Sequence, residues 1–525
     1  MDRSLKPGTV VKTKIKFSAK RLSAGFVGLV WLFSVLSCNL PALSLGDPGN
    51  ALPTLEPTAT VYVPAMQSTA YFVGTQTNDT PTPAPTRTNA PPVIYYAQSG
   101  DSLAALAARF GVVPNDIKSP DPISSNGLLR ISQLFLIPRN VSETSPTTEI
   151  LPDSEVMFSP STLDFDIGAF VKQAGGYLST FYEYTGYGNQ TGAEVVYQVA
   201  QDNSINPRLL LALLEYQAHW VYGTPGNLAD SEYPIEKNMY VNSHGLFNEL
   251  SWAAHQLETG YYGWRTGKLT EVTFPDNTNL HLAPETNAGT VALQYIFSKL
   301  NNQRFWNDVL YSSTGFMALY ERMFGSVWAR SQSVELLFPP DLVQPTLDLP
   351  FYPGMVWSYS GGPHAAWGEG SPLAAVDFAP GSTESGCVLS YTWVLAPAAG
   401  IVVRSSTGIV VLDLDGDGRE QTGWVLFFLH IRTDGRASVG QRLNKDDPIG
   451  HPSCEGGNAT GTHVHIARKY NGEWILADGP LPFILGGWQV HAGAEEYKGS
   501  LTKDGKTITA DTNGSAYTQI TRPKP

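Results

Sequence analysis

Two stretches of the 525-residue chain are dense in proline, serine and threonine, and they limit how the chain can fold. Residues 38–92 include TNDTPTPAPTRTNAPP, and residues 140–160 include NVSETSPTTEILPDSE. Stretches of this composition form extended or disordered linkers rather than packed cores. Because the chain is also longer than one typical domain, we expect a multidomain α+β protein with folded parts at 93–139, 161–345 and 346–525.

The first 37 residues combine a basic flank with an apolar run. Residues 22–36, LSAGFVGLVWLFSVL, are too few to favour a membrane span and suit the core of a signal peptide. The run ends in VLSC, which resembles the lipobox of bacterial lipoproteins. That resemblance implies cleavage after residue 37 and a lipid on Cys38, which would anchor the chain to a membrane; an uncleaved anchor is the alternative. Both interpretations predict an extracytoplasmic protein of the cell envelope.

Charge and cysteine content narrow the possible partners and pairings. The formal net charge of −13 argues against nucleic acid as a partner. The chain has three cysteines, so Cys387 and Cys454 remain as a pair if Cys38 carries lipid. An extracytoplasmic compartment favours a disulfide between them over two free buried thiols.

Residues 93–139 have the pattern of a small β-α-α-β module. A strand at 93–97 precedes a helix that Asp101 or Ser102 can cap, a second short helix can start near Pro114, and QLFLIP closes the module as a strand. The motifs SGDSL and LFLIP in this order resemble a LysM module. The resemblance implies binding to glycans such as peptidoglycan, although SPDP replaces the usual Asn-Pro; a spacer domain without a ligand is the alternative.

Residues 161–345 are predicted to be helical, with two helices separated at Asn206-Pro207. The segments NPRLLLALLEYQ, SHGLFNEL and NAGTVALQYI resemble the lysozyme-like fold of lytic transglycosylases. In that alignment the family's catalytic acid falls on Gln217, and Glu215, two positions earlier, faces another way on the helix. Glutamine cannot protonate a leaving oxygen as a carboxylic acid does. We therefore expect this domain to bind glycan or to be architectural rather than catalytic.

From about residue 346 the pattern changes to short strands and glycine-rich turns, which predicts an antiparallel β domain. In GTHVHIARKY the residues His463 and His465 lie two apart on a predicted strand and therefore point the same way. His364, Asp377 and His430 are further polar candidates in this region. Imidazole and carboxylate side chains suit Zn²⁺, which takes three protein ligands and a water in catalytic sites.

The order HAAWGEGSPLAAVDFA, FLHI, GTHVHIA resembles lysostaphin-type zinc endopeptidases, which cut peptides in peptidoglycan. The resemblance implies that His364, Asp377 and His465 hold the zinc and that His430 and His463 are catalytic. Twelve residues separate His364 from Asp377 here, where that family usually has three, so the insertion must loop out. A decayed peptidase kept for binding is the alternative.

Other motifs in this domain favour structural roles. Asp413, Asp415 and Asp417 match half of a calcium loop, but Trp424 occupies the twelfth position; a hairpin tip is favoured over a weak calcium site. His451 and His491 lack partners at motif spacing and are interpreted as turn or surface residues. Asp504-Gly505 predicts a hairpin in a C-terminal β extension.

Together these patterns predict a membrane-anchored lipoprotein in which a LysM module and a helical lysozyme-like domain precede an antiparallel zinc metalloendopeptidase. The expected substrate is the peptide stems or cross-links of peptidoglycan. The alternative is a catalytically inactive lipoprotein that binds peptidoglycan or regulates another hydrolase.

Overall fold

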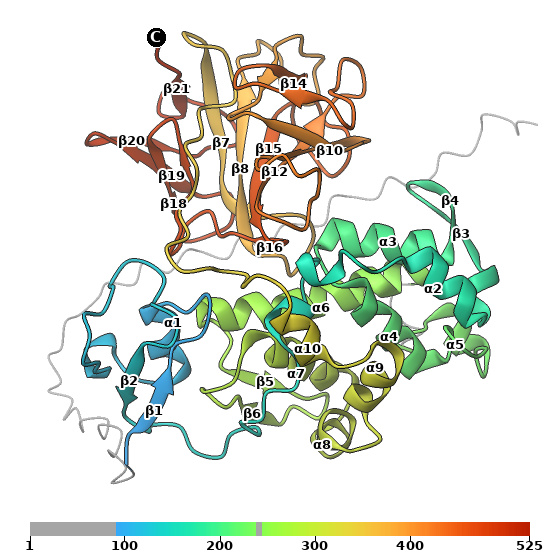
Figure 1. Cartoon of the computed structure of the whole chain (residues 1–525). Coiled ribbons are helices and arrows are strands. Elements are labelled where there is room, and N and C mark those ends of the chain that lie inside the picture. Colours follow the sequence, from blue (N-terminus) through green and yellow to red (C-terminus); the bar gives the residue numbers. More distant parts are fainter. Residues whose placement is uncertain (1–90, 238–243, 525) are drawn as a thin grey trace, which may run out of the picture. The chain divides into compact units, whose positions relative to one another are not determined.

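The first folded part is a small unit of two paired strands, with a helix between them in the sequence (Figure 1). In the computed structural model, which describes residues 91–237 and 244–524, β1 (Val93–Tyr96) pairs antiparallel with β2 (Leu134–Ile137). Between them lie α1 (Leu103–Arg109) and a single 3₁₀ turn, η1 (Pro114–Asp116), where the sequence predicted a second helix. The predicted signal peptide, Cys38 and residues 38–90 of the first linker lie outside the described residues.

A buried carboxylate organises this unit. Asp101 accepts hydrogen bonds from the Tyr95 hydroxyl at 2.6 Å and from Arg109 at 2.8 Å, so its burial leaves no charge unpaired. Ser102, one of the two predicted caps, accepts from the backbone N–H of Ala105 at the start of α1. Arg109 also donates to the carbonyl of Trp264, which ties the unit to the helical region.

The helical region follows the predicted pattern (Figure 1). Thr191 and Glu194 form a capping box at the start of α3, and Asn206 caps α4 ahead of Pro207. The predicted separation at Asn206-Pro207 is therefore confirmed. The elements are η2 (Asp153–Glu155), η3 (Pro160–Thr162), α2 (Ile167–Ala174), η4 (Tyr177–Thr180), α3 (Gly192–Asn203), α4 (Pro207–Ala218), α5 (Leu228–Glu232), α6 (Leu246–Thr266), α7 (Ala288–Leu300), α8 (Gln303–Tyr311), α9 (Phe316–Phe324) and α10 (Val327–Gln332), with hairpins β3 (Tyr182–Thr185) with β4 (Gly188–Thr191) and β5 (Glu271–Thr273) with β6 (Asn279–His281).

The prediction that residues 140–160 form a linker is wrong for residues 150–160, which belong to the helical core. Leu151, Val156 and Met157 are completely buried. Glu155 is buried as well and forms a 2.7 Å ion pair with Arg330 of α10. The proline and serine content favours an extended chain. Burial of these apolar side chains nevertheless stabilises the packed conformation.

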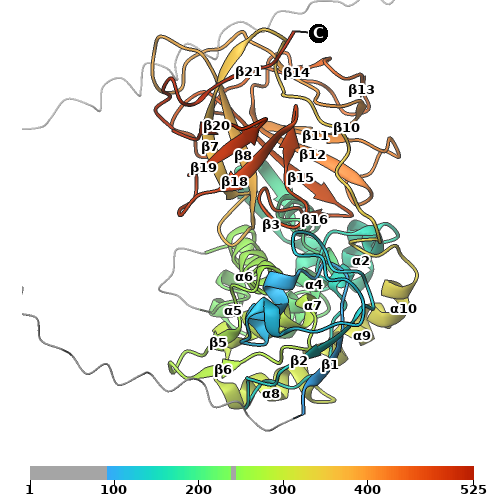
Figure 2. The same cartoon turned by 90° about the vertical axis from the view of Figure 1, so that its left-hand side faces the viewer.

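The C-terminal region is an antiparallel β structure, as predicted (Figure 2). Its main sheet has the order β13-β10-β11-β12-β15-β8-β7-β21, with β16 paired to β15. A second sheet, β17-β18-β19-β20, contains the predicted Asp504-Gly505 hairpin turn between β19 and β20. The strands are β7 (Val356–Ala365), β8 (Leu373–Pro380), β9 (Val394–Leu395), β10 (Gly400–Ser406), β11 (Gly408–Asp413), β12 (Trp424–Ile431), β13 (Arg442–Leu443), β14 (Pro448–Gly450), β15 (Val464–Tyr470), β16 (Glu473–Trp474), β17 (Ile484–Leu485), β18 (Trp488–Ala492), β19 (Gly499–Lys503), β20 (Lys506–Thr509) and β21 (Gln519–Thr521).

The two sides of the main sheet belong to different cores because successive strand residues point to opposite sides. On β15, Val464 and Ile466 join a core formed within the β-rich region. Ala467 points the other way and joins the same cluster as the helices. We call this second side the helix-facing side; it also carries Ala375, Ile409, Val411, Phe427 and Leu429.

Buried polar contacts join the helical region to the helix-facing side. Arg404 on β10 forms a 2.8 Å ion pair with Asp202 on α3, and both side chains are buried. Tyr261 on α6 donates to Glu473 on β16 at 2.7 Å. No helix among the described residues is long and apolar enough to cross a membrane.

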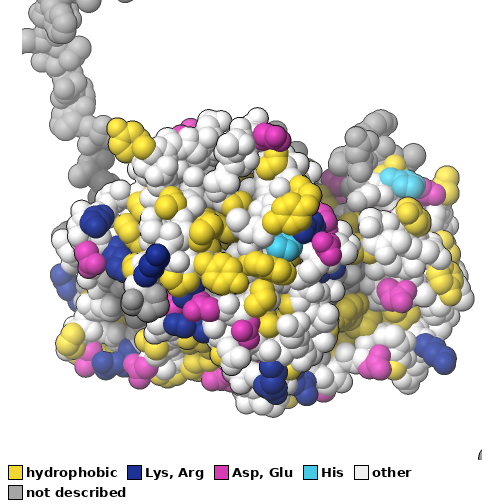
Figure 3. Space-filling view, turned by 90° about the horizontal axis from the view of Figure 1, so that it is seen from above, with side chains coloured by type: hydrophobic (Ala, Val, Ile, Leu, Met, Phe, Trp, Pro, Cys, Tyr) yellow, Lys and Arg dark blue, Asp and Glu magenta, His cyan; other side chains and the backbone are white. Residues whose placement is uncertain are grey.

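The surface of the β-rich region retains some apolar side chains. Figure 3 shows hydrophobic side chains spread over the face viewed from above. In the loop between β8 and β9, Leu389 and Tyr391 have 64% and 73% of their surface exposed. Isolated exposed apolar residues are normal, so this surface alone assigns no partner.

Candidate metal centre

Strand register brings the three predicted metal ligands together. His465 on β15 lies directly opposite Asp377 on β8, and Asp377 lies opposite Gly361 on β7. The β7–β8 register shifts between Gly361 and His364, and His364 consequently reaches the same side of the sheet. Nε2 of His364 and Nδ1 of His465 lie 3.3 and 3.5 Å from Oδ1 of Asp377.

The long spacing between His364 and Asp377 is divided between a loop and the ends of the two hairpin strands. β7 continues to Ala365 and β8 begins at Leu373, so only residues 366–372 lie outside the hairpin strands. The predicted loop therefore exists but is short. His364 pairs with Ala375 across the hairpin, which holds it beside the other two ligands.

Backbone carbonyls orient both ligand imidazoles. Nδ1 of His364 lies 2.8 Å from the Gly362 oxygen, and Nε2 of His465 lies 3.0 Å from the Ala366 oxygen. A carbonyl only accepts, so each of these nitrogens carries the proton in the neutral ring. The remaining nitrogens, Nε2 of His364 and Nδ1 of His465, then present lone pairs to each other across 2.9 Å.

Such a cluster fits a divalent metal ion. Oδ1 of Asp377 is buried and has no hydrogen-bond partner. A buried oxygen beside two lone pairs is costly unless a cation lies among them. Although burial raises it, the neighbouring imidazoles of His364 and His463 hold the pKa of Asp377 well below its usual range. Two imidazoles and one ionised carboxylate are a ligand set of catalytic zinc.

The two predicted catalytic histidines lie beside this cluster. Nε2 of His463 is 3.7 Å from Oδ1 of Asp377, and the ring centroids of His430 and His463 are 4.5 Å apart. Nδ1 of His430 donates to the carbonyl of Glu455, and Nδ1 of His463 donates to the carbonyl of Gly461. Nε2 of each ring is thus left to accept a proton. Burial, together with the neighbouring His463 and His465, lowers the pKa of His430 to about 3.

A β-bulge brings His430 to this side of the sheet. Regular alternation would place His430 with Phe428 on the opposite side. Instead, Phe428 pairs with Val410 and Ile431 pairs with Gly408, so Leu429 and His430 both oppose Ile409. His430 has a φ of +63°, in the left-handed region.

Sequence reasoning did not identify Tyr497 as part of the site. Its ring stacks on His364 with centroids 4.2 Å apart and an angle of 18° between the planes. Its backbone accepts from Gly362 and donates to Pro363, so it comes from the β18–β19 loop of the C-terminal extension. No motif in that loop marks the contact; only the strand order brings it to the site.

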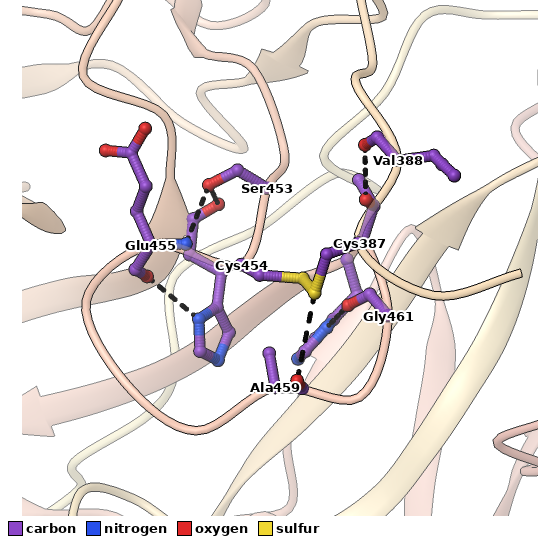
Figure 4. Close-up of a disulfide and its surroundings, with 10 residues drawn as sticks. Cys387, Val388, Ser453, Cys454, Glu455, Ala459 and Gly461 are labelled. Carbon is purple, nitrogen blue, oxygen red and sulfur yellow. Dashed lines mark hydrogen bonds between the residues drawn. A yellow bond between two sulfur atoms is a disulfide. The ribbon is translucent and has the colours of Figure 1, made fainter. Parts of the chain in front are cut away.

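The predicted disulfide between Cys387 and Cys454 is confirmed. Figure 4 shows it between the segment that carries Val388 and the loop that carries Ser453 and Glu455. The bond therefore braces the loop whose carbonyl binds His430.

Other sequence candidates lie away from this centre. Glu215 is buried and accepts from the backbone N–H groups of Val221 and Tyr222, which is a structural role in the helical region. Its carboxylate is thus engaged in holding the backbone of the helical region.

The acidic loop lies at a hairpin tip, as the sequence favoured. Asp413 ends β11 and accepts from the backbone N–H groups of Asp415, Gly416 and Gly418. Burial, together with Asp415, raises the pKa of Asp413 to about 6. A weak calcium site there stays the alternative to that interpretation.

The two histidines interpreted as turn or surface residues have ordinary partners. His451 is buried rather than exposed: Nδ1 lies 2.7 Å from the Thr392 oxygen and the ring packs on Trp393. The surface interpretation of His451 is therefore corrected. His491 on β18 pairs with the Thr502 hydroxyl.

Comparisons with known proteins find relatives among proteases. The family model described as LasA, N-terminal domain, matches residues 149–337. Protease LasA of Pseudomonas aeruginosa is 23% identical over 313 residues, covering 56% of this chain and 69% of the relative. The β-lytic metalloendopeptidase of Lysobacter enzymogenes is 27% identical over 169 residues, covering 30% of this chain and 90% of the relative.

Solved structures give weaker global matches. The M23 metalloprotease pseudoalterin is 23% identical, covers 32% of this chain and 96% of its own, and has a TM-score of 0.28. The catalytic domain of lysostaphin from Staphylococcus simulans is 20% identical and has a TM-score of 0.17, covering 23% of this chain and 87% of its own. The sequence relatives and the His/Asp/His cluster together support a metallopeptidase. The lysozyme-like fold of the helical region stays a prediction.

Proposed function

We propose that this chain is a zinc metalloendopeptidase of the cell envelope that hydrolyses peptide stems or cross-links of peptidoglycan. The observation that carries the proposal is the cluster of His364, Asp377 and His465, in which two imidazole lone pairs and one unpartnered buried carboxylate oxygen converge. The related metalloendopeptidases support the same chemistry.

The residues of the site divide the work as follows. Zinc, when bound by the three ligands, supplies Lewis-acid chemistry that lowers the pKa of a water and polarises a scissile carbonyl. His430 and His463 each offer an unprotonated Nε2, so either can accept the proton of the attacking water. Once protonated, the same nitrogen can donate to the developing oxyanion or to the leaving amine.

His463 is more exposed than the three ligands. Its side chain keeps 15% of its surface exposed, whereas the side chains of the three ligands keep 8% or less. A polymer approaching the sheet would therefore meet His463 before the ligands.

The N-terminal part of the chain supports the proposed location and partners. The resemblance of residues 93–139 to LysM supports binding to peptidoglycan glycan, and the lipobox-like VLSC supports attachment through Cys38 to a membrane. Peptidoglycan and that membrane are accordingly the proposed partners, with the enzyme on the extracytoplasmic side.

The test incubates the purified full chain with zinc and with peptidoglycan from several cell-wall types, and separates the products by mass spectrometry. Asp377→Ala is the inactive variant, and Asp434→Ala, whose side chain is 88% exposed, is the matched control. New stem-peptide fragments with the unaltered chain and Asp434→Ala, and none with Asp377→Ala, are expected. Zinc-loaded protein that releases no fragments from any wall type would contradict the proposal.

A further inference from the structure

The bulge that aims His430 depends on a close backbone approach at Gly408. This residue starts β11 opposite Ile431, with a φ of +74°. A Cβ built on Gly408 would overlap the carbonyl oxygen of Glu455 and lie 2.5 Å from both its carbonyl carbon and the Cα of Gly456. These atoms are backbone and cannot swing away, so position 408 has no room for a side chain.

The Glu455 carbonyl oxygen, which has room beside Gly408 only because that residue lacks a side chain, is the atom that accepts a hydrogen bond from His430. Nδ1 of His430 lies 3.0 Å from the Glu455 carbonyl oxygen. Neutral imidazole has one N–H, and its position is set by the hydrogen bond that the ring makes. With the proton fixed on Nδ1, Nε2 of His430 is the unprotonated nitrogen.

The Glu455 loop is held from several sides (Figure 4). Ser453 donates to the His430 carbonyl from its backbone at 2.7 Å and from its hydroxyl at 3.0 Å. Thr433 donates to the Glu455 carboxylate from its backbone at 2.8 Å and from its hydroxyl at 2.6 Å. The disulfide between Cys387 and Cys454 also fixes this loop. The loop therefore cannot retreat without breaking these bonds.

We propose that Gly408 is a positioning residue for His430: it lets the Glu455 carbonyl reach Nδ1 and thereby fixes the tautomer that leaves Nε2 free. In the reaction, the fixed tautomer keeps Nε2 of His430 available as a proton acceptor beside the metal ligands. This catalytic role rests on the proposed peptidase function. The fixed tautomer itself is a property of the chain and does not require activity.

The test compares Gly408→Ala with Gly440→Ala in the full chain. Gly440 has a φ of +83° and no atom within 4 Å of a built Cβ, so it matches the backbone strain without the overlap. Zinc content, kcat and KM are measured, and the His430 tautomer is read from ring nitrogen–proton correlations in chain labelled with ¹⁵N-histidine, assigned against His430→Gln.

Gly408→Ala should retain zinc and KM but lose the single Nδ1–H tautomer, with kcat lower by about 100-fold, the low end of a general base's contribution. Gly440→Ala should keep the tautomer and kcat. An unchanged His430 tautomer in Gly408→Ala would overturn the inference, and so would loss of zinc there but not in Gly440→Ala, because the role would then be support of the whole site.

A second variant covers the case in which Gly408→Ala does not fold. Gly456→Ala forces apart the same close approach from the loop side, because a Cβ there would lie 2.7 Å from both the Cα of Gly408 and the carbonyl oxygen of Thr407. A mixed tautomer at His430 with a fall in kcat is expected; an unchanged tautomer refutes the inference. If the unaltered chain shows no peptidase activity, the proposed function fails while the tautomer comparison still decides the role of Gly408.

Discussion

Nε2 of His364 and Nδ1 of His465 face each other across 2.9 Å, although the other nitrogen of each ring donates to a backbone carbonyl. Two lone pairs at this distance repel unless a proton or a cation lies between them. A metal cation bound between the two nitrogens would therefore stabilise this orientation of the rings.

Removing the metal should accordingly destabilise the fold. A ligand that binds only the native state adds about 4 kcal/mol of stability at a concentration of 1,000 times its Kd. Thermal unfolding with and without a chelator should show a lower Tm after chelation, recovered on addition of zinc. Equal Tm values for the two forms, with metal content verified, would show that the site binds zinc weakly or not at all.

His463→Ala should separate catalysis from metal binding. His463 lies beside Asp377 but its ring is not needed for the His364, Asp377 and His465 cluster. Peptidase activity should fall by about 10²- to 10⁴-fold, the contribution of a positioned acid–base group, while zinc content stays unchanged. Loss of zinc from this variant would place His463 among the ligands.

Asp202→Ala should weaken the junction between the helical region and the sheet. Asp202 pairs with Arg404 at 2.8 Å, and both are buried, but Arg404 also pairs with the buried Glu420 at 2.9 Å and keeps that partner in the variant. The cost should therefore lie below the roughly 3–5 kcal/mol of a buried charge left with no partner. Denaturant unfolding measures the loss; Asp434→Ala, which removes an exposed partner of Arg432, should cost less than about 1 kcal/mol. Equal effects of the two variants would contradict this ranking.

Stability should also depend on pH through Glu473. Burial raises the pKa of Glu473 from 4.5 to about 7, despite Arg265 and the hydroxyl of Tyr261. The native state thus binds the proton more tightly than the unfolded state, so this contribution is full below pH 4.5 and is lost as pH rises through 7.

The measurement for this residue is unfolding free energy from pH 5 to 8, in the unaltered chain and in Glu473→Gln. The unaltered chain should lose up to about 3 kcal/mol from this group over that range, and the variant should lack that fall. The glutamine side chain still accepts from Tyr261, which makes it the appropriate comparison. Parallel pH profiles would rule out Glu473 as the titrating group.

The order of polar residues in the sequence predicted much of the site because strand alternation is local. His463 and His465 were expected on one side, and both rings lie within 4 Å of the same Asp377 oxygen. The bulge at His430 was not predictable, because it depends on Gly408 of the neighbouring strand and on the Glu455 carbonyl. Local periodicity alone puts His430 on the wrong side.

Composition alone did not predict that part of the segment 140–160 is buried. Residues 140–160 carry linker-like serine and proline, yet Leu151, Val156 and Met157 complete the helical core. The packing of helices on the sheet was likewise not visible in the sequence, since Arg404 and Asp202 are far apart along the chain. Long-range contacts of this kind have no local signature.

The most direct measurement is the number of zinc ions bound per purified chain, by mass spectrometry of the intact native protein. The unaltered chain and Asp434→Ala should each hold one zinc ion, and Asp377→Ala should hold none. Zinc bound equally by Asp377→Ala, or by none of the three proteins at saturating zinc, would contradict a metal centre at His364, Asp377 and His465.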